Sequence, residues 1–341
     1  MVPRSERSRV TYEDVAVLIP CHNEATTIAE VVTGFRRHLP GARVVVCDNN
    51  STDDTGALAV EAGADVIRET HRGKGYAVRR LFSDVDAAFF IMVDGDGTYD
   101  ASAAPEMIRL MREDGVDTVL AAREARSDDG AAEFRVGHQW GNRVFSRTFA
   151  FLFDTSYSDV LTGYRGFSRR FVKSCPLLAR GFEVEIELNA HGASLGMPWA
   201  ELSTAYVERV TGSESKLNTY SDGARIFRRL FRLFRDFRPA LSFGLPGLLL
   251  GLLGVIIVIP VLVTYQDTGT VPRFPTLFVV IGLFLAALVL GLVGAILERA
   301  SRDRLERNRL AYLSVPAPWQ HRGSHESQPF AVEAPVAAHL D

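Results

Sequence analysis

The stretch VAVLIPCHNE, residues 15–24, joins five apolar residues to a group of polar ones. A short apolar run that is rich in valine and isoleucine predicts a buried strand. The polar residues that follow it are typical of a loop at the carboxyl end of that strand. Residues 28–35 then place apolar side chains at helical spacing. The stretch therefore predicts a strand, a polar loop and a helix in succession.

The same pattern recurs further along the chain. A second apolar run at 44–46 is followed by DNNSTD at 48–53, and a third at 88–93 is followed by DGDG at 94–97. Helical patterns separate these runs, and a further short strand is expected at 118–121. This β-α alternation predicts an α/β fold with a mostly parallel sheet that is covered by helices.

The polar groups that follow the strands indicate a binding site, because ligands of such sheets bind beyond the carboxyl ends of the strands. Asp94 and Asp96 are two residues apart and can share one divalent cation through hard oxygen ligands. An Asp-Gly pair is also common in plain turns. Because two more acidic clusters follow neighbouring strands, we favour the site. Lys74, between two glycines, suits a negatively charged ligand, although a solvent-exposed turn has the same pattern.

Composition and missing motifs exclude several classes of protein. The net charge of −3 gives no global reason to expect nucleic-acid binding. Three cysteines exclude a disulfide framework and a four-cysteine zinc site. No glycine-rich dinucleotide fingerprint follows the first strand, and the P-loop, GxSxG and HExxH motifs are absent. The sequence leaves the oligomeric state open.

Two long uncharged segments lie near the carboxyl end of the chain. Residues 241–263 and 276–297 contain 23 and 22 residues without a charge. A helix of this length spans about 33 Å, which is enough for a hydrocarbon core of about 30 Å. Two buried helices of a soluble core are the alternative, and the length and the absence of charge disfavour it. We therefore expect two transmembrane helices.

Arginines surround both predicted spans. Six lie between residues 225 and 238 and five between 299 and 309, whereas the connecting loop, 265–275, has only Arg273. The positive-inside rule then predicts a protein of the cytoplasmic membrane, with both termini and the domain that precedes the spans in the cytoplasm. Residues 223–238 form an amphipathic pattern, with arginines opposite phenylalanines and leucines. This predicts a juxtamembrane helix in the headgroup layer, and a helix packed on the domain is the alternative.

These patterns divide the chain into six parts. They are an amino-terminal tail (1–13), a domain (14–222), the juxtamembrane helix (223–238), two spans (241–263 and 276–297) and a cytoplasmic, largely disordered tail (298–341).

Four motifs together resemble the family 2 glycosyltransferases of GT-A fold. They are Val17–Glu24, Asp48-x-x-Ser51-x-Asp53-x-Thr55, Gly73–Gly75 and Asp94–Asp96, and their order and spacing match over roughly residues 14–220. The resemblance is strongest to the branch of dolichyl-phosphate mannose synthases and polyprenyl-phosphate glycosyltransferases. Many members of that branch carry the same two carboxyl-terminal spans.

The resemblance implies roles for the matching positions. The base and ribose pocket of the nucleotide would be lined by Pro20, Glu24, Asp48 and Asp53, with Lys74 beside the nucleotide. Asp94 and Asp96 would place Mg²⁺ or Mn²⁺ on the donor diphosphate. Arg123, Arg209 and Lys216 match positions that act on phosphate groups. Residues 159–165 match a D-x-x-S-G-F-R segment in which Thr162 replaces serine. His138 and Asn142 depart from the residues expected for the acceptor phosphate.

The resemblance implies inverting, metal-dependent transfer of a single hexose from UDP-glucose or GDP-mannose to a membrane polyprenyl phosphate. The QxxRW signature of processive members is absent. One alternative is a lipid hydroxyl acceptor, which needs a carboxylate base such as Glu183 or Glu185. The acidic-apolar alternation at 183–187 fits a strand with a solvated face equally well. Another alternative is a catalytically inactive membrane scaffold.

Overall fold

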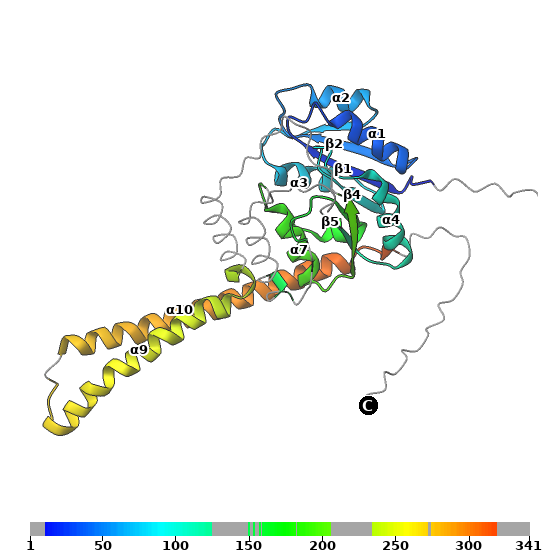
Figure 1. Ribbon diagram of the computed structural model, residues 1–341. Helices are drawn as coiled ribbons and strands as arrows, with labels where there is room; N and C mark the ends of the chain where they lie inside the picture. Colours follow the sequence, from blue (N-terminus) through cyan, green and yellow to red (C-terminus); the bar gives the residue numbers. More distant parts are fainter. Residues whose placement is uncertain are drawn as a thin grey trace, which may run out of the picture.

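The chain folds into an α/β domain from which two long helices project as a hairpin (Figure 1). A computed structural model describes residues 11–124, 149–150, 153, 157, 159–181, 183–205, 234–271 and 274–318. Its strands are β1 (Val15–Cys21), β2 (Arg43–Asp48), β3 (Asp65–Arg68), β4 (Phe89–Met92), β5 (Thr118–Glu124), β6 (Arg165–Ser168) and β7 (Trp199–Ala205). Its α-helices are α1 (Ile28–His38), α2 (Thr55–Glu61), α3 (Lys74–Asp84), α4 (Ala104–Glu113), α6 (Arg169–Ser174), α7 (Val184–Ser194), α9 (Pro239–Thr268) and α10 (Phe274–Leu313).

The seven strands form one sheet in the order β3-β2-β1-β4-β6-β5-β7. Strand β6 is antiparallel to β4 and β5, and the other neighbours pair in parallel. The expected α/β fold with a mostly parallel sheet is therefore confirmed. The chain leaves β1 toward β2 on one side and reaches β4 on the other. Such a reversal opens a crevice at the carboxyl ends of the strands, where ligands bind.

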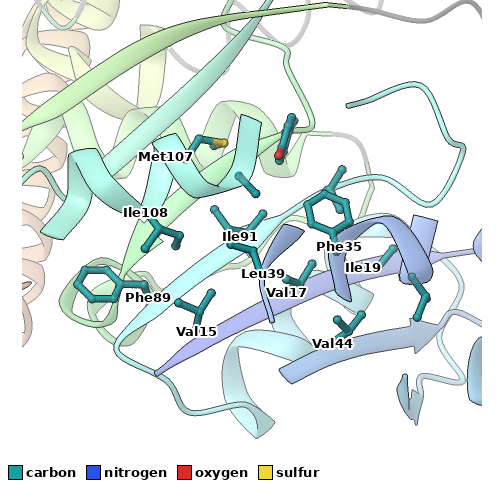
Figure 2. Packing of buried hydrophobic residues seen from close by; sticks show 14 of the residues in the cluster. Val15, Val17, Ile19, Phe35, Leu39, Val44, Phe89, Ile91, Met107 and Ile108 are labelled. Carbon is teal, nitrogen blue, oxygen red and sulfur yellow. The ribbon is translucent and has the colours of Figure 1, made fainter. Parts of the chain in front are cut away.

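The core has two layers because successive side chains of a strand point to opposite faces of the sheet. Val15, Val17 and Ile19 of β1 pack under α1 and α4, where Figure 2 shows Phe35 and Met107 above them. The intervening residues of β1 face the opposite layer, which α3, α6 and α7 cover. Both faces of β1 are thus buried, which explains why its sequence is a continuous apolar run.

Part of the fold differs from the expectation. Strands β3, β6 and β7 carry no continuous apolar run, and the sequence pattern did not predict them. The strand alternative for 183–187 is wrong, since Val184–Ser194 forms helix α7. Of the predicted juxtamembrane helix, 234–237 is helical and 223–233 lies outside the described residues.

Helices α9 and α10 are each long and apolar enough to cross a membrane. Only 17% and 11% of their most apolar windows are buried, so these are not core helices of the domain. The two helices approach closely at glycines. A Cβ atom on Gly247 would lie 3.1 Å from the carbonyl oxygen of Ala287. This contact between small residues is typical of packed membrane helices.

Helix α10 also corrects the expected boundary of the carboxyl-terminal tail. It continues without a break from the apolar segment to Leu313, so residues 298–313 are helical and not part of a disordered tail. Residues 319–341 lie outside the described part of the chain.

The neutral state of His191 gives a pH-dependent contribution to stability. Burial lowers its pKa to about 4, and its Nε2 pairs with the hydroxyl of Ser174 at 3.0 Å. The unfolded chain binds this proton at higher pH than the folded one. The free energy of unfolding should therefore fall by about 1.4 kcal/mol per pH unit between about pH 6.5 and 4 because of this group. Urea unfolding at several pH values should give a flatter dependence for His191→Gln, and equal slopes would contradict the prediction.

Candidate active site

The three polar segments meet at the carboxyl ends of β1, β2 and β4, as the sequence predicts. The backbone N–H of Glu24, after β1, donates to the hydroxyl of Thr55, after β2, at 2.9 Å. The hydroxyl of Thr27 donates to the carbonyl oxygen of Gly95, after β4, at 2.6 Å. Hydrogen bonds thus join the three loops into one wall of the crevice. Pro20 lies within β1, at the base of this wall.

Asp48 and Asp53, two expected nucleotide ligands, shape the loop after β2. Asp48 accepts a hydrogen bond from the backbone N–H of Ser51 at 2.9 Å. Asp53 accepts from the backbone N–H of Ala25 at 3.2 Å and from the hydroxyl of Thr55 at 2.5 Å. Burial alone would raise the pKa of Asp53, but these hydrogen bonds outweigh it and hold the pKa below its usual range. Asp53 therefore stays ionised and braces the loop.

Asn49 is a site residue that the sequence analysis missed. Its side-chain amide donates to the carbonyl oxygen of His71 at 2.7 Å, and its amide oxygen accepts from the backbone N–H of Gly73 at 2.7 Å. This pair of bonds ties the loop that precedes α3 to the end of β2. Asn49 thereby fixes the place at which Lys74 begins α3.

The two glycines beside Lys74 have a steric reason. A Cβ atom on Gly73 would lie 2.2 Å from the carbonyl oxygen of Arg180, and one on Gly75 would lie 2.3 Å from that of Ala179. Gly73 also has φ +142°, which L side chains rarely adopt. Only glycine lets the start of α3 pack this tightly against residues 179–180. The Gly-Lys-Gly motif thus drives the lysine side chain into the domain, not into solvent.

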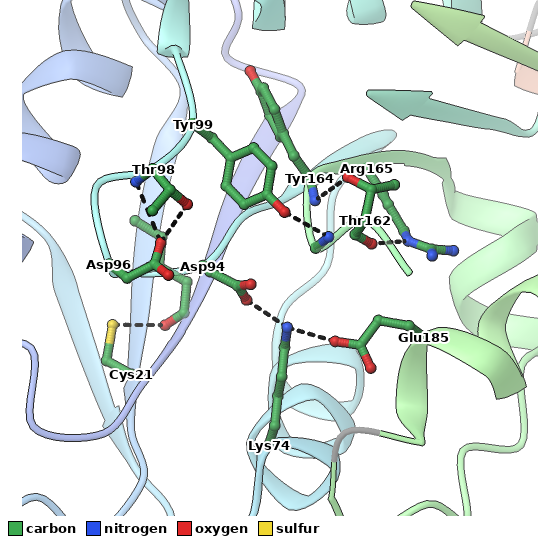
Figure 3. Close-up of polar contacts among 12 residues, drawn as sticks. Cys21, Lys74, Asp94, Asp96, Thr98, Tyr99, Thr162, Tyr164, Arg165 and Glu185 are labelled. Carbon is green, nitrogen blue, oxygen red and sulfur yellow. Dashed lines mark hydrogen bonds and ion pairs between the residues drawn. The ribbon is translucent and has the colours of Figure 1, made fainter. Parts of the chain in front are cut away.

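Lys74 forms the electrostatic centre of the site (Figure 3). Its ammonium lies 2.5 Å from an oxygen of Asp94 and 2.7 Å from Oε1 of Glu185, and its side chain is nearly buried. Burial alone would lower the pKa of Lys74, but the two carboxylates outweigh this effect and raise it above its usual value. The lysine is therefore a fixed positive charge. It joins α3 to the end of β4 and to the first turn of α7.

One carboxylate oxygen of Glu185 is still able to accept a hydrogen bond or contact a cation. Only 6% of its side chain is exposed, and its Oε2 atom is buried with no hydrogen-bond partner in the described part of the chain. Glu183, the other candidate base, lies in the turn before α7. One ammonium between two carboxylates leaves a formal excess of negative charge. This excess suits a ligand that brings a cation.

Asp96, two residues after Asp94, and Gly163, which lies against Asp94, belong to the same part of the site. Asp96 accepts a hydrogen bond from the hydroxyl of Thr98 at 2.7 Å, so its side chain is held in one direction. A Cβ atom on Gly163 would lie only 2.2 Å from an oxygen of Asp94. The segment that contains Gly163 is fastened by the hydroxyl of Tyr99, which accepts from the Gly163 N–H at 2.9 Å. The neighbouring chain thus forms a close cradle around Asp94.

Arg165 holds the segment 159–165 from within. This fully buried guanidinium donates to the carbonyl oxygens of Thr162 and Val160 at 2.8 and 2.9 Å and to the side chain of Asn189 at 2.5 Å. All three contacts are internal to the domain. The matched segment therefore contributes a rigid support beside Asp94, and its arginine is a structural residue.

The donor set fits a divalent cation in part. Asp94 and Asp96 supply hard carboxylate oxygens, and Lys74 already places positive charge against Asp94. Among the described residues, no group of three or more acidic, histidine or cysteine side chains converges as a complete metal cage. Magnesium sites often use one or two carboxylates and take further ligands from substrate phosphates. Two aspartates at the edge of an open crevice match that arrangement.

Several expected site residues lie outside the described part of the chain. Arg209 and Lys216 are among them, as are His138 and Asn142. The backbone of Arg123 lies in β5, opposite Thr204 of β7, and its side chain is not described.

The ion-paired lysine should be essential for stability. Lys74→Met removes the cation and leaves two carboxylates together, so we expect the free energy of unfolding to fall by about 3–5 kcal/mol. The double variant Lys74→Met/Glu185→Gln should recover part of this loss because it removes one buried charge. Arg80→Met, which breaks an exposed pair with Asp84, should cost less than about 1 kcal/mol. Urea unfolding of the full chain in detergent measures all three, and equal losses for both single variants would contradict the assignment.

Comparisons with known proteins agree with this geometry. The model of the family described as glycosyl transferase family 2 matches residues 16–175. The glycosyltransferase AglJ of Haloferax volcanii is 38% identical over 238 residues, which cover 70% of this chain and 77% of that protein. A dolichyl-phosphate hexose transferase of the same organism is 29% identical over 223 residues, covering 65% of this chain and 95% of the relative.

The solved structures show the same fold. Glucosyl-3-phosphoglycerate synthase from Mycobacterium tuberculosis superposes with a TM-score of 0.52 at 21% identity, over 64% of this chain and 78% of that one. The domain therefore has the GT-A fold that the motifs implied. Together with the family match and the archaeal relative, this shows that the chain belongs to glycosyl transferase family 2 and is a glycosyltransferase that uses a sugar nucleotide.

Proposed function

We propose that this protein transfers a single hexose, with inversion, from a nucleoside-diphosphate sugar such as UDP-glucose or GDP-mannose to a polyprenyl phosphate in the membrane. One observation carries the proposal. The buried Lys74 is held against Asp94 at the carboxyl end of β4, in a family 2 domain that continues into two candidate membrane spans.

The donor half of the proposal rests on the charges at the edge of the sheet. In the reaction, an acceptor oxygen attacks the anomeric carbon while the bond from that carbon to the diphosphate oxygen breaks. Negative charge develops on the departing nucleoside diphosphate. A fixed and nearly buried ammonium stabilises such charge without reorganisation. Lys74 supplies that ammonium, and Arg123, Arg209 and Lys216 are proposed to add positive charge around the phosphates.

Asp94 and Asp96 are the proposed ligands of Mg²⁺ or Mn²⁺. When bound, the metal would neutralise charge on the diphosphate leaving group. The solved complex of the mycobacterial glucosyl-3-phosphoglycerate synthase that contains Mn²⁺ and UDP-glucose supports a divalent ion at such a site. Asp94 faces Lys74, and Asp96 is oriented by Thr98, so this chain presents both carboxylates before a ligand arrives.

A phosphate acceptor suits the acid–base groups of the site. The second pKa of a phosphate monoester is about 6, so at neutral pH the acceptor is mostly ionised and needs positioning more than a general base. Oε1 of Glu185 is already held by Lys74, which makes it less available as a base. The relative that is named a dolichyl-phosphate hexose transferase supports a lipid phosphate.

The membrane arrangement follows from the charge around the spans. Arginines precede α9 and follow the apolar part of α10, and we propose that both ends of the hairpin lie on the cytoplasmic side. Residues 223–238 are proposed to lie in the headgroup layer. The catalytic domain would then face an acceptor whose phosphate stays at the bilayer surface.

A lipid hydroxyl is the second candidate acceptor. The buried Oε2 atom of Glu185, which has no partner among the described residues, favours it. A hydroxyl acceptor must lose a proton during attack, and a carboxylate within hydrogen-bond reach is the ordinary base for that step.

The test is sugar transfer by the full chain, purified in detergent, to a short polyprenyl phosphate. Labelled UDP-glucose and GDP-mannose are supplied separately, each with Mg²⁺, with Mn²⁺ or with EDTA. We expect a lipid product from one donor that EDTA prevents and that mild acid hydrolyses, since a glycosyl phosphate is acid-labile. Asp96→Asn should lower the rate by a factor of about 10²–10³.

The exposed Asp86, which pairs with Arg169 away from the crevice, provides the control. Asp86→Asn should transfer sugar at the rate of the unaltered chain. An acid-stable lipid product that forms only when a diacylglycerol replaces the polyprenyl phosphate would favour the hydroxyl acceptor. Binding of a donor without any lipid product from either sugar would refute the proposal.

A further inference from the structure

We propose that Tyr312 and Asp117 form a latch that fastens the carboxyl-terminal end of α10 to the catalytic domain and thereby holds the active site in a fixed position relative to the membrane hairpin. The hydroxyl of Tyr312 donates to Asp117 at 2.8 Å, across 195 positions of sequence. Only the expected effect on a membrane acceptor rests on the proposed function. The latch itself rests on contacts within the chain.

Other side chains of the domain hold the carboxylate of Asp117 in position to accept a hydrogen bond from this hydroxyl. Its side chain is 0% exposed and lies immediately before β5. Arg170 makes a two-pronged ion pair with it, at 2.5 and 2.7 Å, and Ser168 donates at 2.6 Å. A buried carboxylate of this kind is stable only when its oxygens are satisfied. The hydroxyl of Tyr312 supplies a further bond to a group that the domain already orients.

The ring of Tyr312 is enclosed by cationic side chains. The guanidinium of Arg170 lies 4.5 Å from the ring centroid, and that of Arg309 lies 5.4 Å from it. Only 6% of Tyr312 is exposed, and it packs with the core layer formed by α3, α6 and α7. A residue of the candidate membrane helix therefore completes the core of the catalytic domain.

A second contact leads from α10 toward the active site. Arg309 donates to the carbonyl oxygen of Leu195 at 2.7 Å, at the end of α7. Helix α7 also carries Glu185 in its first turn, and the carboxylate of Glu185 contacts the ammonium of Lys74. The end of α10 thus touches the helix that positions the ion pair. Figure 1 shows α10 running back beneath the domain toward these elements.

The length of α10 sets the distance between the apolar segment of the helix and the contact of Tyr312 with Asp117. From Leu297, the last residue of the apolar segment, a continuous helix to Tyr312 rises about 22 Å. The hydroxyl of Ser301 and the guanidinium of Arg304 also bond to the carbonyl oxygen of Asp236, just before α9. These bonds join α10 to the segment before α9, and in that segment the ring of Phe237 packs against Phe153 of the domain with centroids 4.7 Å apart. The domain therefore contacts the hairpin near both of its ends. Two attachments prevent the hinge motion that a single connection would allow.

This rigidity has a consequence for a lipid acceptor. The phosphate of a membrane lipid stays at the height of the headgroups, so productive attack requires the catalytic crevice to be held at a matching height and angle. Pre-set orientation of this kind removes an entropic cost from the reaction. A small acceptor that diffuses freely needs no such alignment. We therefore class Tyr312 as a positioning residue whose loss should affect membrane acceptors selectively.

The test uses the full chain in lipid nanodiscs and a graded series at one position. Tyr312→Phe removes the hydroxyl, and Tyr312→Ala also removes the ring. Leu310→Ala is the matched control, because Leu310 lies on the same turn but is 68% exposed. Hydrogen exchange should become at least tenfold faster at residues 300–313 in Tyr312→Ala, less so in Tyr312→Phe, and stay unchanged at 276–297 and in the control.

The functional arm compares two acceptors with the donor that supports transfer. We expect kcat/KM for undecaprenyl phosphate in the bilayer to fall about tenfold in Tyr312→Ala, while that for soluble geranyl phosphate stays within twofold. Equal losses for both acceptors, or no loss for the bilayer acceptor, would overturn the positioning role. Unchanged exchange at 300–313 would overturn the latch. If the unaltered chain uses neither acceptor, the proposed function fails, and the exchange result still decides the latch.

Discussion

The burial of one ammonium between two carboxylates constrains this domain more than any other contact at its site. Lys74, Asp94 and Glu185 come from α3, from the end of β4 and from α7, and no two of them are neighbours in sequence. A buried charge is tolerated only when its partners are in place. The antiparallel strand β6 has to return the chain beside β4 before α7 can deliver Glu185. The topology of the second half of the sheet is thus coupled to the charge balance of the crevice.

The predictable part of the fold is the part whose residues are buried on both faces. Strands β1, β2 and β4 lie inside the mostly parallel sheet, and their continuous apolar runs identify them. Strand β6 is only four residues long and begins with the buried Arg165, which bonds to Thr162 and Val160 in the preceding turn and to Asn189 of α7. The charged residues of 183–187 alternate with apolar ones, yet they begin a helix. Local alternation cannot reveal this, because the partner that allows Glu185 to be buried is 111 positions away.

The sequence predicted the location of the candidate site better than it predicted the contacts within it. Asp94 and Asp96 were predicted as site residues from their spacing after a strand, and Lys74 from its flanking glycines. The sequence did not indicate that Lys74 points at Asp94, because that follows from the carbonyl oxygens of residues 179–180 pressing on both glycines. Asp53 was expected to contact the nucleotide, and the structure engages its carboxylate with the loop itself. Asn49 lay within the same polar cluster, and its role required knowing where the loop before α3 passes.

The segment 298–313 shows how a polar helix can be misjudged from its sequence. It lacks an apolar face, and such a segment forms a stable helix only with side-chain pairs or a distant partner. Glu298 pairs with Arg302 and Arg299 with Asp303 at i,i+4 spacing, each contributing about 0.3–0.5 kcal/mol. These pairs are too weak to hold sixteen residues in order alone. The contact that holds this helix is the hydrogen bond from the hydroxyl of Tyr312, in the last turn of α10, to the carboxylate of Asp117, 195 positions away in the sequence. Since both ends of the hairpin contact the domain, its orientation is a property of the catalytic core as much as of the membrane.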